Sequence, residues 1–333
     1  MTEGARSAGL AFAVTLALAP LILVLLRRRA LLDHPNDRSS HESPTPRGLG
    51  LAPAIGALVA LVAIPAIDGS ARTGLLIAAA GFGLLGLLED VAGVAPLPRL
   101  GAQLLIAGAS LFWLLDGLGG PAAWQVVFAA GCALWLVAYV NAFNFMDGIN
   151  GISAAQVLVA AGAWWAIGHI EDIPALSDPA LVIGAATLAF TPFNFPTARA
   201  FLGDVGSYFL GAWLAVAVIV GLRAGLPPEA VIAPLSLYLA DTATTIVRRV
   251  RTKEAWYLPH RSHAYQRLTQ LGWSHTRTTL AVAVTMAATS ALGALSLTDS
   301  LALRAAGDTV LAAALAAYLL SPSALDETAS PPG

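Results

Sequence analysis

The sequence predicts an all-α integral membrane protein: a polytopic helical bundle with eleven candidate transmembrane spans and the N-terminus outside. Hydrophobic residues make up 57% of the chain and charged residues 11%, whereas soluble domains carry about 25% charged residues. Apolar stretches recur at lengths that can cross the ~30 Å hydrocarbon layer of a bilayer. Basic residues gather in alternate connecting segments, which indicates the orientation.

A window of about 19 residues separates the apolar stretches into individual spans. In chain order, the expected spans are 8–26, 48–67, 73–88, 100–115, 121–140, 152–170, 178–193, 205–222, 229–247, 277–297 and 301–320. The first ends in Arg27-Arg28-Arg29, a stop-transfer pattern, so we expect a retained helix and not a cleaved signal. Residues 1–320 are then a single transmembrane domain, and residues 321–333 a short, disordered cytoplasmic tail.

The distribution of basic residues orients the bundle. If the arginine triplet is cytoplasmic, fourteen of the 18 Lys and Arg residues lie at the inner side, and only Arg6, Arg72, Arg223 and Arg304 lie at the outer side. The inner segments also hold nearly all of the unusual polar residues, whereas the outer connections are typical of turns. These inner segments are 27–47, 89–99, 141–151, 194–204 and 248–276. The sequence therefore predicts a site at the cytoplasmic face.

The cysteine count and the net charge limit the chemistry. Cys132 is the only cysteine and lies in an apolar span, which excludes disulfides and cysteine-based metal sites. Any metal must be held by oxygen or imidazole ligands. The net charge of −2 gives no indication of nucleic-acid binding, because the charges are unevenly placed.

The first two inner segments each offer candidate binding groups. His41 and Arg47 lie in a Pro- and Ser-rich loop and could approach an anion, although the loop could also be a solvated linker. Glu89 and Asp90 end an apolar span, where acids oppose the helix dipole. Residues in such an unfavourable position at the membrane surface suggest a function, although a solvated helix end is the alternative. Arg99 closes this segment.

The third inner segment, NAFNFMDGING, follows a charge-free span without a gap. Asn141, Asn144 and Asp147 recur every third residue, so a continuing helix would place them along one edge. Gly148 and Gly151 would then let the backbone leave helical geometry. This pattern indicates either a site at a membrane exit or a capped helix end with a polar turn.

The fourth inner segment places Asp204 between Gly203 and Gly206 at the start of a span. Free N–H groups at a helix N-terminus suit a metal that carries a phosphate, and an N-cap aspartate is the competing explanation. Asp241 lies inside the next span and should face the protein interior, because a carboxylate facing lipid is costly.

The last inner segment combines cations with aromatic rings, and includes His260, Arg261 and His263. The two histidines could lie three apart on one helix face, but without a nearby carboxylate they indicate zinc only weakly. Rings that stack and cations that bind a diphosphate suit a nucleotide better. A basic loop that only follows the charge asymmetry of membrane proteins is the alternative.

Together, these five segments resemble the polyprenyl-phosphate N-acetylhexosamine-1-phosphate transferase family, from about Asp33 to Gly272. NAFNFMDGINGI and FLGDVGSYFLG carry the resemblance, while HPNDRSSHESPTPRGLG and LPHRSHAYQRL look like the branch that initiates O-antigen synthesis. The resemblance implies an enzyme of the bacterial inner membrane, an all-helical bundle of ten or eleven transmembrane helices with an active-site cleft that faces the cytoplasm. It would convert a UDP-N-acetylhexosamine and undecaprenyl phosphate into undecaprenyl-diphospho-N-acetylhexosamine and UMP, with Mg²⁺, or alternatively Mn²⁺, as cofactor.

The resemblance also implies roles for individual residues. Asp204 would be the main Mg²⁺ ligand, and Asp147 with Asn144 would contact the metal or the nucleotide. Asp90, with Glu89, would act on the polyprenyl phosphate as a base or orienting group. The remaining expected binding residues, for diphosphate, sugar or phosphate, are His41, Arg47, Arg99, His260, Arg261 and His263.

Two departures from the family pattern weaken parts of this assignment. Glu89 stands where the family usually has a first aspartate, and Asn150 stands where many relatives carry a second aspartate. A transferase of UDP-MurNAc-pentapeptide is an alternative, although HRSHAYQRL lacks the three consecutive histidines expected there. A secondary transporter is a second alternative, disfavoured by the absence of an inverted repeat. The loop suits a small sugar, with a 6-deoxy sugar somewhat preferred, and a homodimer stays open.

Overall fold

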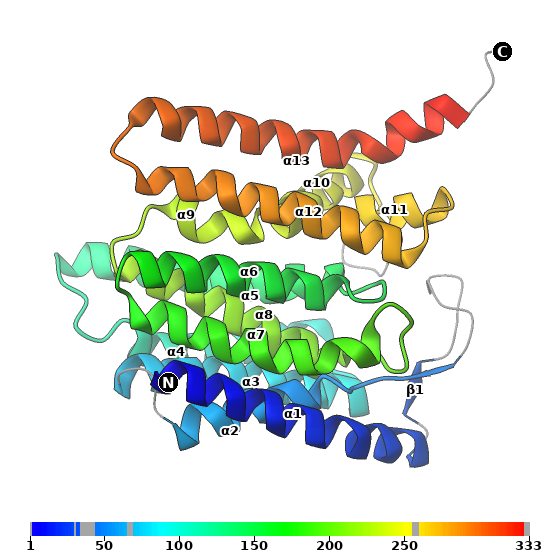
Figure 1. Ribbon diagram of the computed structural model, residues 1–333, viewed down its shortest axis with the longest axis horizontal. Coiled ribbons are helices and arrows are strands. Elements are labelled where there is room, and N and C mark those ends of the chain that lie inside the picture. The colour runs from blue at the N-terminus through cyan, green and yellow to red at the C-terminus, as the bar shows by residue number, and fades with distance from the viewer. Residues whose placement is uncertain (1, 30, 34–43, 65–68, 255–259, 330–333) are drawn as a thin grey trace.

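The computed structural model describes residues 2–29, 31–33, 44–64, 69–254 and 260–329, and these form a bundle of helices with one very short sheet (Figure 1). In chain order the elements are α1 (Glu3–Arg28), β1 (Leu32–Asp33), β2 (Thr45–Pro46), α2 (Leu51–Ala63), α3 (Gly69–Ala92), α4 (Pro96–Leu114), α5 (Ala122–Met146), α6 (Ile152–Ile170), α7 (Pro174–Asn194), α8 (Gly203–Arg223), α9 (Pro228–Ile232), the 3-10 helix η1 (Ala233–Leu235), α10 (Ser236–Arg251), α11 (Ala264–Gln270), α12 (His275–Ala294), the 3-10 helix η2 (Leu295–Leu297) and α13 (Leu301–Ala329).

The predicted fold class, an all-α polytopic membrane protein, is confirmed. Among the described residues, 10 helical segments are long and apolar enough to cross a membrane, counting Pro228–Arg251 as one segment. The remaining predicted span, 48–67, is the shorter helix α2. α2 runs antiparallel to α1, because the Ser7 hydroxyl near the start of α1 donates to the Ala60 carbonyl near the end of α2, at 3.2 Å.

Several predicted boundaries are wrong by a few residues. The spans predicted at 73–88, 100–115 and 178–193 are α3, α4 and α7, and each of these helices begins about four residues earlier than predicted. Proline stands in the first turn of α4 and α7. An N–H group at this position has no partner within the helix, so its absence in proline costs no hydrogen bond. The predicted tail from residue 321 is mostly helical instead, because α13 continues through Pro322 to Ala329.

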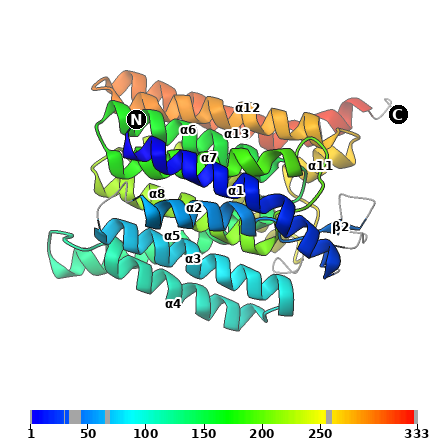
Figure 2. The ribbon, with the colours of Figure 1, turned by 60° about the horizontal axis from the view of Figure 1, so that its bottom comes forward.

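Helix α8 lies at the centre of the bundle and packs along α3 and α5 (Figures 1 and 2). Its side chains Phe209 and Trp213 are fully buried. Close packing of α3 on α8 depends on Gly86, where a Cβ would lie 2.1 Å from the Asp204 carbonyl oxygen. A larger residue there would push the end of α3 away from the start of α8.

The loop before α2 is hydrogen-bonded to the segment before α8. β1 and β2 pair antiparallel, and the Phe201 amide donates to the Pro46 carbonyl at 2.8 Å. In return, the Leu49 amide donates to the Phe201 carbonyl at 3.0 Å. Arg47 is therefore held next to the N-terminus of α8.

Candidate active site

Polar residues from the predicted inner segments meet at one end of the bundle, where β1 and α11 lie (Figure 1). α1 begins at the opposite end (Figures 1 and 2). The contacts that join these segments cross long stretches of sequence, from Arg47 to Asp204 and from Tyr265 to the turn after α5. The prediction that these segments share one face of the bundle is confirmed for the described residues. His41 lies outside the described residues.

A guanidinium group bridges two carboxylates at the centre of this end. Arg47 Nε lies 2.9 Å from Asp90 Oδ1, and Arg47 Nη2 lies 2.8 Å from Asp204 Oδ1. The Asp90 side chain is 8% exposed and the Asp204 side chain 16%, whereas Arg47 is 40% exposed. Burial alone would lower the pKa of Arg47, but the carboxylates of Asp204 and Asp90 raise it above its ordinary value. The cluster is therefore open to solvent on the arginine side.

Asp90 caps the N-terminus of α8 from a neighbouring helix. Its Oδ1 accepts a hydrogen bond from the Asp204 amide at 3.0 Å, and its Oδ2 accepts one from the Val205 amide at 2.9 Å. These are N–H groups of the first turn, which have no partner within their own helix. Gly203 makes this approach possible, because its φ is +76° and a Cβ there would lie 2.7 Å from Asp90 Oδ2. Asp90 thus fixes the position of Asp204.

The NAFNFMDGING segment connects α5 to three neighbouring helices. Asn141 Nδ2 donates to Gln103 of α4 at 2.8 Å, and Asn144 Nδ2 donates to Asp204 Oδ1 at 2.8 Å. Asp147 is the C-cap of α5, and its Oδ1 accepts from the Ser153 hydroxyl of α6 at 2.6 Å. The expected single edge of polar side chains ends at Met146, because the helix stops there.

Asp147 lies within electrostatic reach of the central cluster. Burial raises its pKa to about 6, the hydrogen bond from Ser153 lowers it, and the neighbouring Asp204 carboxylate raises it. The positive charge of Arg47 acts in the opposite direction. A divalent cation nearby would favour the ionised form of both carboxylates.

Asp204 and Asp147 fit a magnesium ion by their chemistry. Among the described residues, Asp204 Oδ1 accepts from Arg47 and Asn144, and no group donates to its Oδ2. Nor do the described residues contain a cluster of three or more His, Cys, Asp or Glu side chains that could hold a metal. Mg²⁺ commonly uses one or two protein carboxylates together with water and substrate phosphates. A pair of carboxylates would therefore suit Mg²⁺ better than a metal that needs a complete set of protein ligands.

Glu89 and Asp90 are neighbours in sequence but have different partners. Glu89 Oε2 accepts from the Val94 amide at 2.8 Å, and Glu89 Oε1 lies 3.3 Å from Arg99 Nη1. Glu89 therefore orders the turn between α3 and α4, whereas Asp90 faces α8. The two carboxylates are not a symmetric pair.

A second cluster surrounds Asp241, which is buried as predicted. Its Oδ1 lies 3.1 Å from His263 Nδ1, and its Oδ2 accepts from the Tyr318 hydroxyl at 2.8 Å. His263 is the N-cap of α11, so the expectation that His260 and His263 share a helix face is wrong. Their ring centroids nevertheless lie 5.0 Å apart.

The loop that contains His260 and Arg261 is held by α10 and α11. Arg248 donates to the Ser262 carbonyl, and Gln270 Nε2 donates to the Arg261 carbonyl at 2.9 Å. Burial lowers the pKa of His260 to about 4, and the neighbouring His263, Arg249 and Arg248 lower it as well. The lowered pKa favours the neutral form of His260 at pH 7.

Tyr265 links the two clusters. Its hydroxyl donates to the Phe145 carbonyl at 3.2 Å, and a Cβ on Gly148 would lie 2.2 Å from the same oxygen. The basic loop therefore lies next to the turn that carries Asp147. Burial raises the pKa of Tyr265 well above its ordinary value, so the hydroxyl stays protonated and donates.

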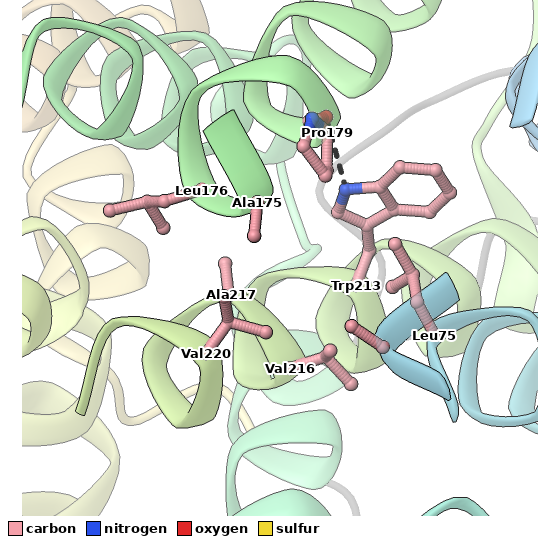
Figure 3. Close-up of a pocket in the computed structure, with 9 residues that line it drawn as sticks. Leu75, Ala175, Leu176, Pro179, Trp213, Val216, Ala217 and Val220 are labelled. Carbon is pink, nitrogen blue, oxygen red and sulfur yellow. Dashed lines mark hydrogen bonds between the residues drawn. The ribbon is translucent and has the colours of Figure 1, made fainter. Parts of the chain in front are cut away.

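A small apolar hollow lies between α3, α7 and α8, away from these clusters (Figure 3). Leu75 near the start of α3 and Val220 near the end of α8 line it, so it belongs to the other end of the bundle. Its polar group, Trp213 Nε1, donates to the Pro179 carbonyl at 3.3 Å. Without converging polar groups, the hollow does not resemble a reaction site.

Four residues of these clusters were not singled out from the sequence. Ser153 and Ser207 bond to Asp147 and Asn144, at 2.6 and 2.9 Å. Gln103 bonds to Asn141, and Tyr318 reaches Asp241 from the last helix. Ser207 follows Asp204 by nearly one helical turn, which is a signal available in the sequence. Nothing in the local sequence of Tyr318 indicates its partner.

The chain matches the family model of glycosyl transferase family 4 over residues 72–222, which contain Asp90, Asp147 and Asp204. It is also 30% identical over 301 residues to the decaprenyl-phosphate N-acetylglucosaminephosphotransferase of Mycobacterium leprae, a match that covers 79% of this chain and 76% of the relative. The chain belongs to glycosyl transferase family 4. The family assignment made from the sequence motifs is confirmed.

Other relatives of this family 4 chain carry related names. The probable undecaprenyl-phosphate N-acetylglucosaminyl 1-phosphate transferase of Bacillus subtilis is 28% identical over 288 residues, covering 82% of this chain and 80% of the relative. The phospho-N-acetylmuramoyl-pentapeptide-transferase of Desulforudis audaxviator is 28% identical over 254 residues, covering 64% of this chain and 75% of the relative. Each of these names describes a transferase that moves a phosphorylated sugar or acts on a polyprenyl phosphate.

Proposed function

We propose that this protein transfers N-acetylhexosamine-1-phosphate from a UDP-sugar to undecaprenyl phosphate, which yields undecaprenyl-diphospho-N-acetylhexosamine and UMP. An oxygen of the lipid phosphate attacks the β-phosphorus of the donor, and the bond from that phosphorus to the bridging oxygen breaks. The observation that carries this proposal is the arginine-bridged pair Asp90 and Asp204 at the rim of an apolar bundle, beside a basic loop. The names of the relatives support the same reaction.

Asp204 and Asp147 would hold Mg²⁺, which would supply positive charge to neutralise the phosphates as they approach one another. The side chains around Asp204 keep it in place for this task. Asn144 orients its carboxylate through Oδ1, and Asp90 holds its backbone amide. We assign Asp90 the role of orienting group, because both of its oxygens accept hydrogen bonds from α8.

The basic residues would bind the anionic parts of both substrates. Arg47 is close to Asp204 and is partly exposed, so it can shift from the carboxylates to a phosphate oxygen. Arg99, near the start of α4, is paired with Glu89. His260, Arg261 and His263, at and before the start of α11, would bind the diphosphate or the sugar of the donor. His41 joins this group as a sequence-based proposal.

The orientation and the location follow from the charge distribution. With the site end in the cytoplasm of a bacterium, a soluble UDP-sugar reaches the site directly, and the prenyl chain enters from the bilayer. Apolar side chains exposed on α4, such as Leu104 and Leu105, face outward as expected for a lipid-facing helix. This arrangement supports an inner-membrane enzyme over a transporter, because the polar residues gather at one end and not at the midplane.

The proposed reaction has two candidate sugar donors. UDP-GlcNAc is the first donor to test, because relatives from Bacillus subtilis and Mycobacterium leprae are named for N-acetylglucosamine transfer. The Desulforudis audaxviator relative favours UDP-MurNAc-pentapeptide as the second candidate. The 6-deoxy preference and the role in O-antigen synthesis stay predictions, since these relatives are not named for O-antigen. Initiation of a cell-surface polysaccharide is common to all of these proposals.

A donor panel tests the proposed function. Purified protein in detergent is incubated with undecaprenyl phosphate, Mg²⁺ and one of UDP-GlcNAc, a UDP-6-deoxy-N-acetylhexosamine or UDP-MurNAc-pentapeptide, and lipid products are separated by chromatography. We expect product from the simple donors, with discrimination among them of roughly 10- to 200-fold. Product from UDP-MurNAc-pentapeptide alone would favour the second candidate, and no lipid product from any donor would overturn the proposed function.

A further inference from the structure

Two amide side chains join α4 to α5 within their membrane-spanning segments, and we call them the amide pair. Gln103 of α4 is 1% exposed. Asn141 Nδ2 of α5 donates to Gln103 Oε1 at 2.8 Å, and Gln103 Nε2 donates to Asn141 Oδ1 at 3.4 Å. Asn141 Nδ2 also donates to the Val137 carbonyl of its own helix at 2.7 Å. Polar side chains inside a membrane are costly unless they are paired, and they often serve a function.

Each member of the amide pair lies about one helical turn from a residue of the candidate site. Arg99 precedes Gln103 by four residues on α4, and Asn144 follows Asn141 by three residues on α5, so the two residues of each helix share a face. α4 begins at the site end of the bundle and α5 ends there. The contact between Gln103 and Asn141 therefore fixes Arg99 relative to Asn144, which donates to Asp204 at 2.8 Å.

Arg99 lies near the carboxylates of the site and has donors to spare. Arg99 and Asp204 both act electrostatically on the hydroxyl of Tyr208, which lies one turn further along α8. The Arg99 side chain is 27% exposed, and its Nη1 lies 3.3 Å from Glu89. A guanidinium group carries five N–H donors, so donors remain for a phosphate. Arg99 is therefore available to an anion that binds beside Asp204.

The position of α4 suits the lipid substrate. α4 lies at the edge of the bundle opposite α12 and α13 (Figure 2). Leu97, Leu100 and Leu104 are exposed on a different side of α4 from Arg99 and Gln103. α4 thus contacts the bilayer with one side and the site with another, whereas the loop assigned to the sugar nucleotide is held by α10 and α11. Arg99 therefore suits the phosphate of the acceptor lipid better than the donor.

α5 is attached to α8 independently of the amide pair. Asn144 Nδ2 donates to Asp204 Oδ1 at 2.8 Å and to the Ser207 hydroxyl at 2.9 Å. Further into the membrane, Trp135 Nε1 donates to the Ala215 carbonyl at 3.0 Å. Loss of the amide pair would therefore displace α4 and leave the carboxylates in place.

We propose that Gln103 and Asn141 are positioning residues for the acceptor: they hold α4 against α5 so that Arg99 binds the phosphate of the polyprenyl phosphate beside Asp204. This inference rests on the proposed function. A displacement of about 1 Å in a group that positions a substrate can cost on the order of 10²-fold in rate. A contact one helical turn away from Arg99 is therefore enough to control how the acceptor binds.

Gln103→Leu tests this proposal, because it keeps most of the side-chain volume and removes both hydrogen bonds of the amide pair. With UDP-GlcNAc and undecaprenyl phosphate as substrates, we expect the KM for undecaprenyl phosphate to rise roughly 5- to 30-fold, the range for one or two lost hydrogen bonds. The KM for UDP-GlcNAc should change less than about threefold, because the carboxylates and the donor loop keep their own anchors. Equal increases in both KM values, or an unchanged KM for undecaprenyl phosphate, would overturn the proposal.

Two further variants separate positioning from a general loss of stability. Asn141→Ala removes the amide pair from the other side and should raise the same KM, and the double variant with Gln103→Leu should lose less than about threefold more. Exchange of the pair, with Gln103→Asn and Asn141→Gln together, keeps both amides and should return the KM to within about threefold of wild type. Additive losses, or an exchanged pair that behaves like Gln103→Leu, would overturn the inference, and Asn141→Ala keeps the test valid if Gln103→Leu fails to fold.

Gln125→Leu is the matched control, at the outer end of α5. Gln125 Nε2 donates to the Leu118 and Gly120 carbonyls at 2.9 and 3.2 Å. Its loss should lower the melting temperature and leave both KM values within about threefold of wild type. A rise in the KM for undecaprenyl phosphate as large as that of Gln103→Leu would overturn the proposal, because any lost amide would then have this effect. If the wild-type protein forms no lipid product in the same assay, the proposed function fails and this inference with it, whereas a contrary result beside normal wild-type turnover overturns this inference alone.

Discussion

Asp90→Asn should lower both the stability and the activity of the protein. Glu89→Gln, in the same helical turn, should lower the stability and the activity less. Asp90 accepts two amide hydrogen bonds at the start of α8 and lies 2.9 Å from Arg47 Nε. Loss of a helix cap costs about 1 kcal/mol, and loss of a charge-assisted hydrogen bond about 1.5–3 kcal/mol. The expected decrease in the free energy of unfolding is therefore about 3 kcal/mol, or roughly 4 °C in melting temperature for a chain of 333 residues.

Glu89→Gln is the matched control, since its amide oxygen can still accept from the Val94 amide. The Arg99 contact at 3.3 Å loses its charge, which for a partly exposed pair costs about 1 kcal/mol at most. We expect Asp90→Asn to lower kcat on the order of 10²-fold, because the position of Asp204 depends on it, and Glu89→Gln to lower it less.

The assay combines thermal melting in detergent with initial rates on UDP-GlcNAc and undecaprenyl phosphate. An Asp90→Asn protein that melts at the wild-type temperature but is inactive would refute the positioning argument, because Asp90 would then act directly in the chemistry. A larger loss of activity at Glu89 than at Asp90 would reverse the assignment of the two carboxylates.

Three further predictions concern the metal, the pH dependence and the topology. Asp204→Asn should abolish turnover, and a chelator should do the same to the wild type until Mg²⁺ or Mn²⁺ is restored; near-normal turnover of the variant at low Mg²⁺ would remove Asp204 from the metal site. The pKa of His260 is lowered to about 4 in the folded protein, so the stability it contributes by staying neutral is present above about pH 6.5 and is lost as the pH falls towards 4. As the pH falls from 6.5 towards 4, the melting temperature of the wild type should therefore approach that of His260→Gln or fall below it. A difference in melting temperature that stays constant over this pH range would contradict the lowered pKa of His260. In a Cys132→Ala background, a cysteine at Thr197 should react only with reagents that reach the cytoplasm, and a cysteine at Gly119 only with impermeant reagents added outside; the reverse pattern would invert the orientation.

The fold was predictable because composition and apolar length alone indicate membrane helices. The grouping of Asp90, Asp147 and Asp204 at one end also followed from counting the predicted spans. Asp90 follows the third span, Asp147 follows the fifth and Asp204 precedes the eighth, so all three lie on the same side of the membrane. The tail beyond residue 320 was not predicted correctly, because Ser321 and Pro322 suggest a helix end. Proline can be accommodated inside a helix that has few neighbours, and α13 continues past it.

The contacts within the site depend on packing that a sequence pattern does not contain. The capping of α8 by Asp90 requires the end of α3 to touch the start of α8, and this depends on Gly86 and Gly203. In the same way, Tyr318 reaches Asp241 across 77 positions of sequence, because α13 contacts α10. Local rules predict which residues are unusual, whereas only the three-dimensional arrangement shows their partners.

The transfer of a sugar together with its phosphate is tested most directly with a donor labelled at the β-phosphorus. Purified protein is incubated with undecaprenyl phosphate, Mg²⁺ and UDP-GlcNAc that carries ³²P in the β position, and lipid and aqueous products are separated. We predict that the label enters the lipid fraction in step with the sugar, and that unlabelled UMP appears in water. Label recovered as UDP, with the sugar alone on the lipid, would contradict phosphosugar transfer, as would the absence of any lipid product.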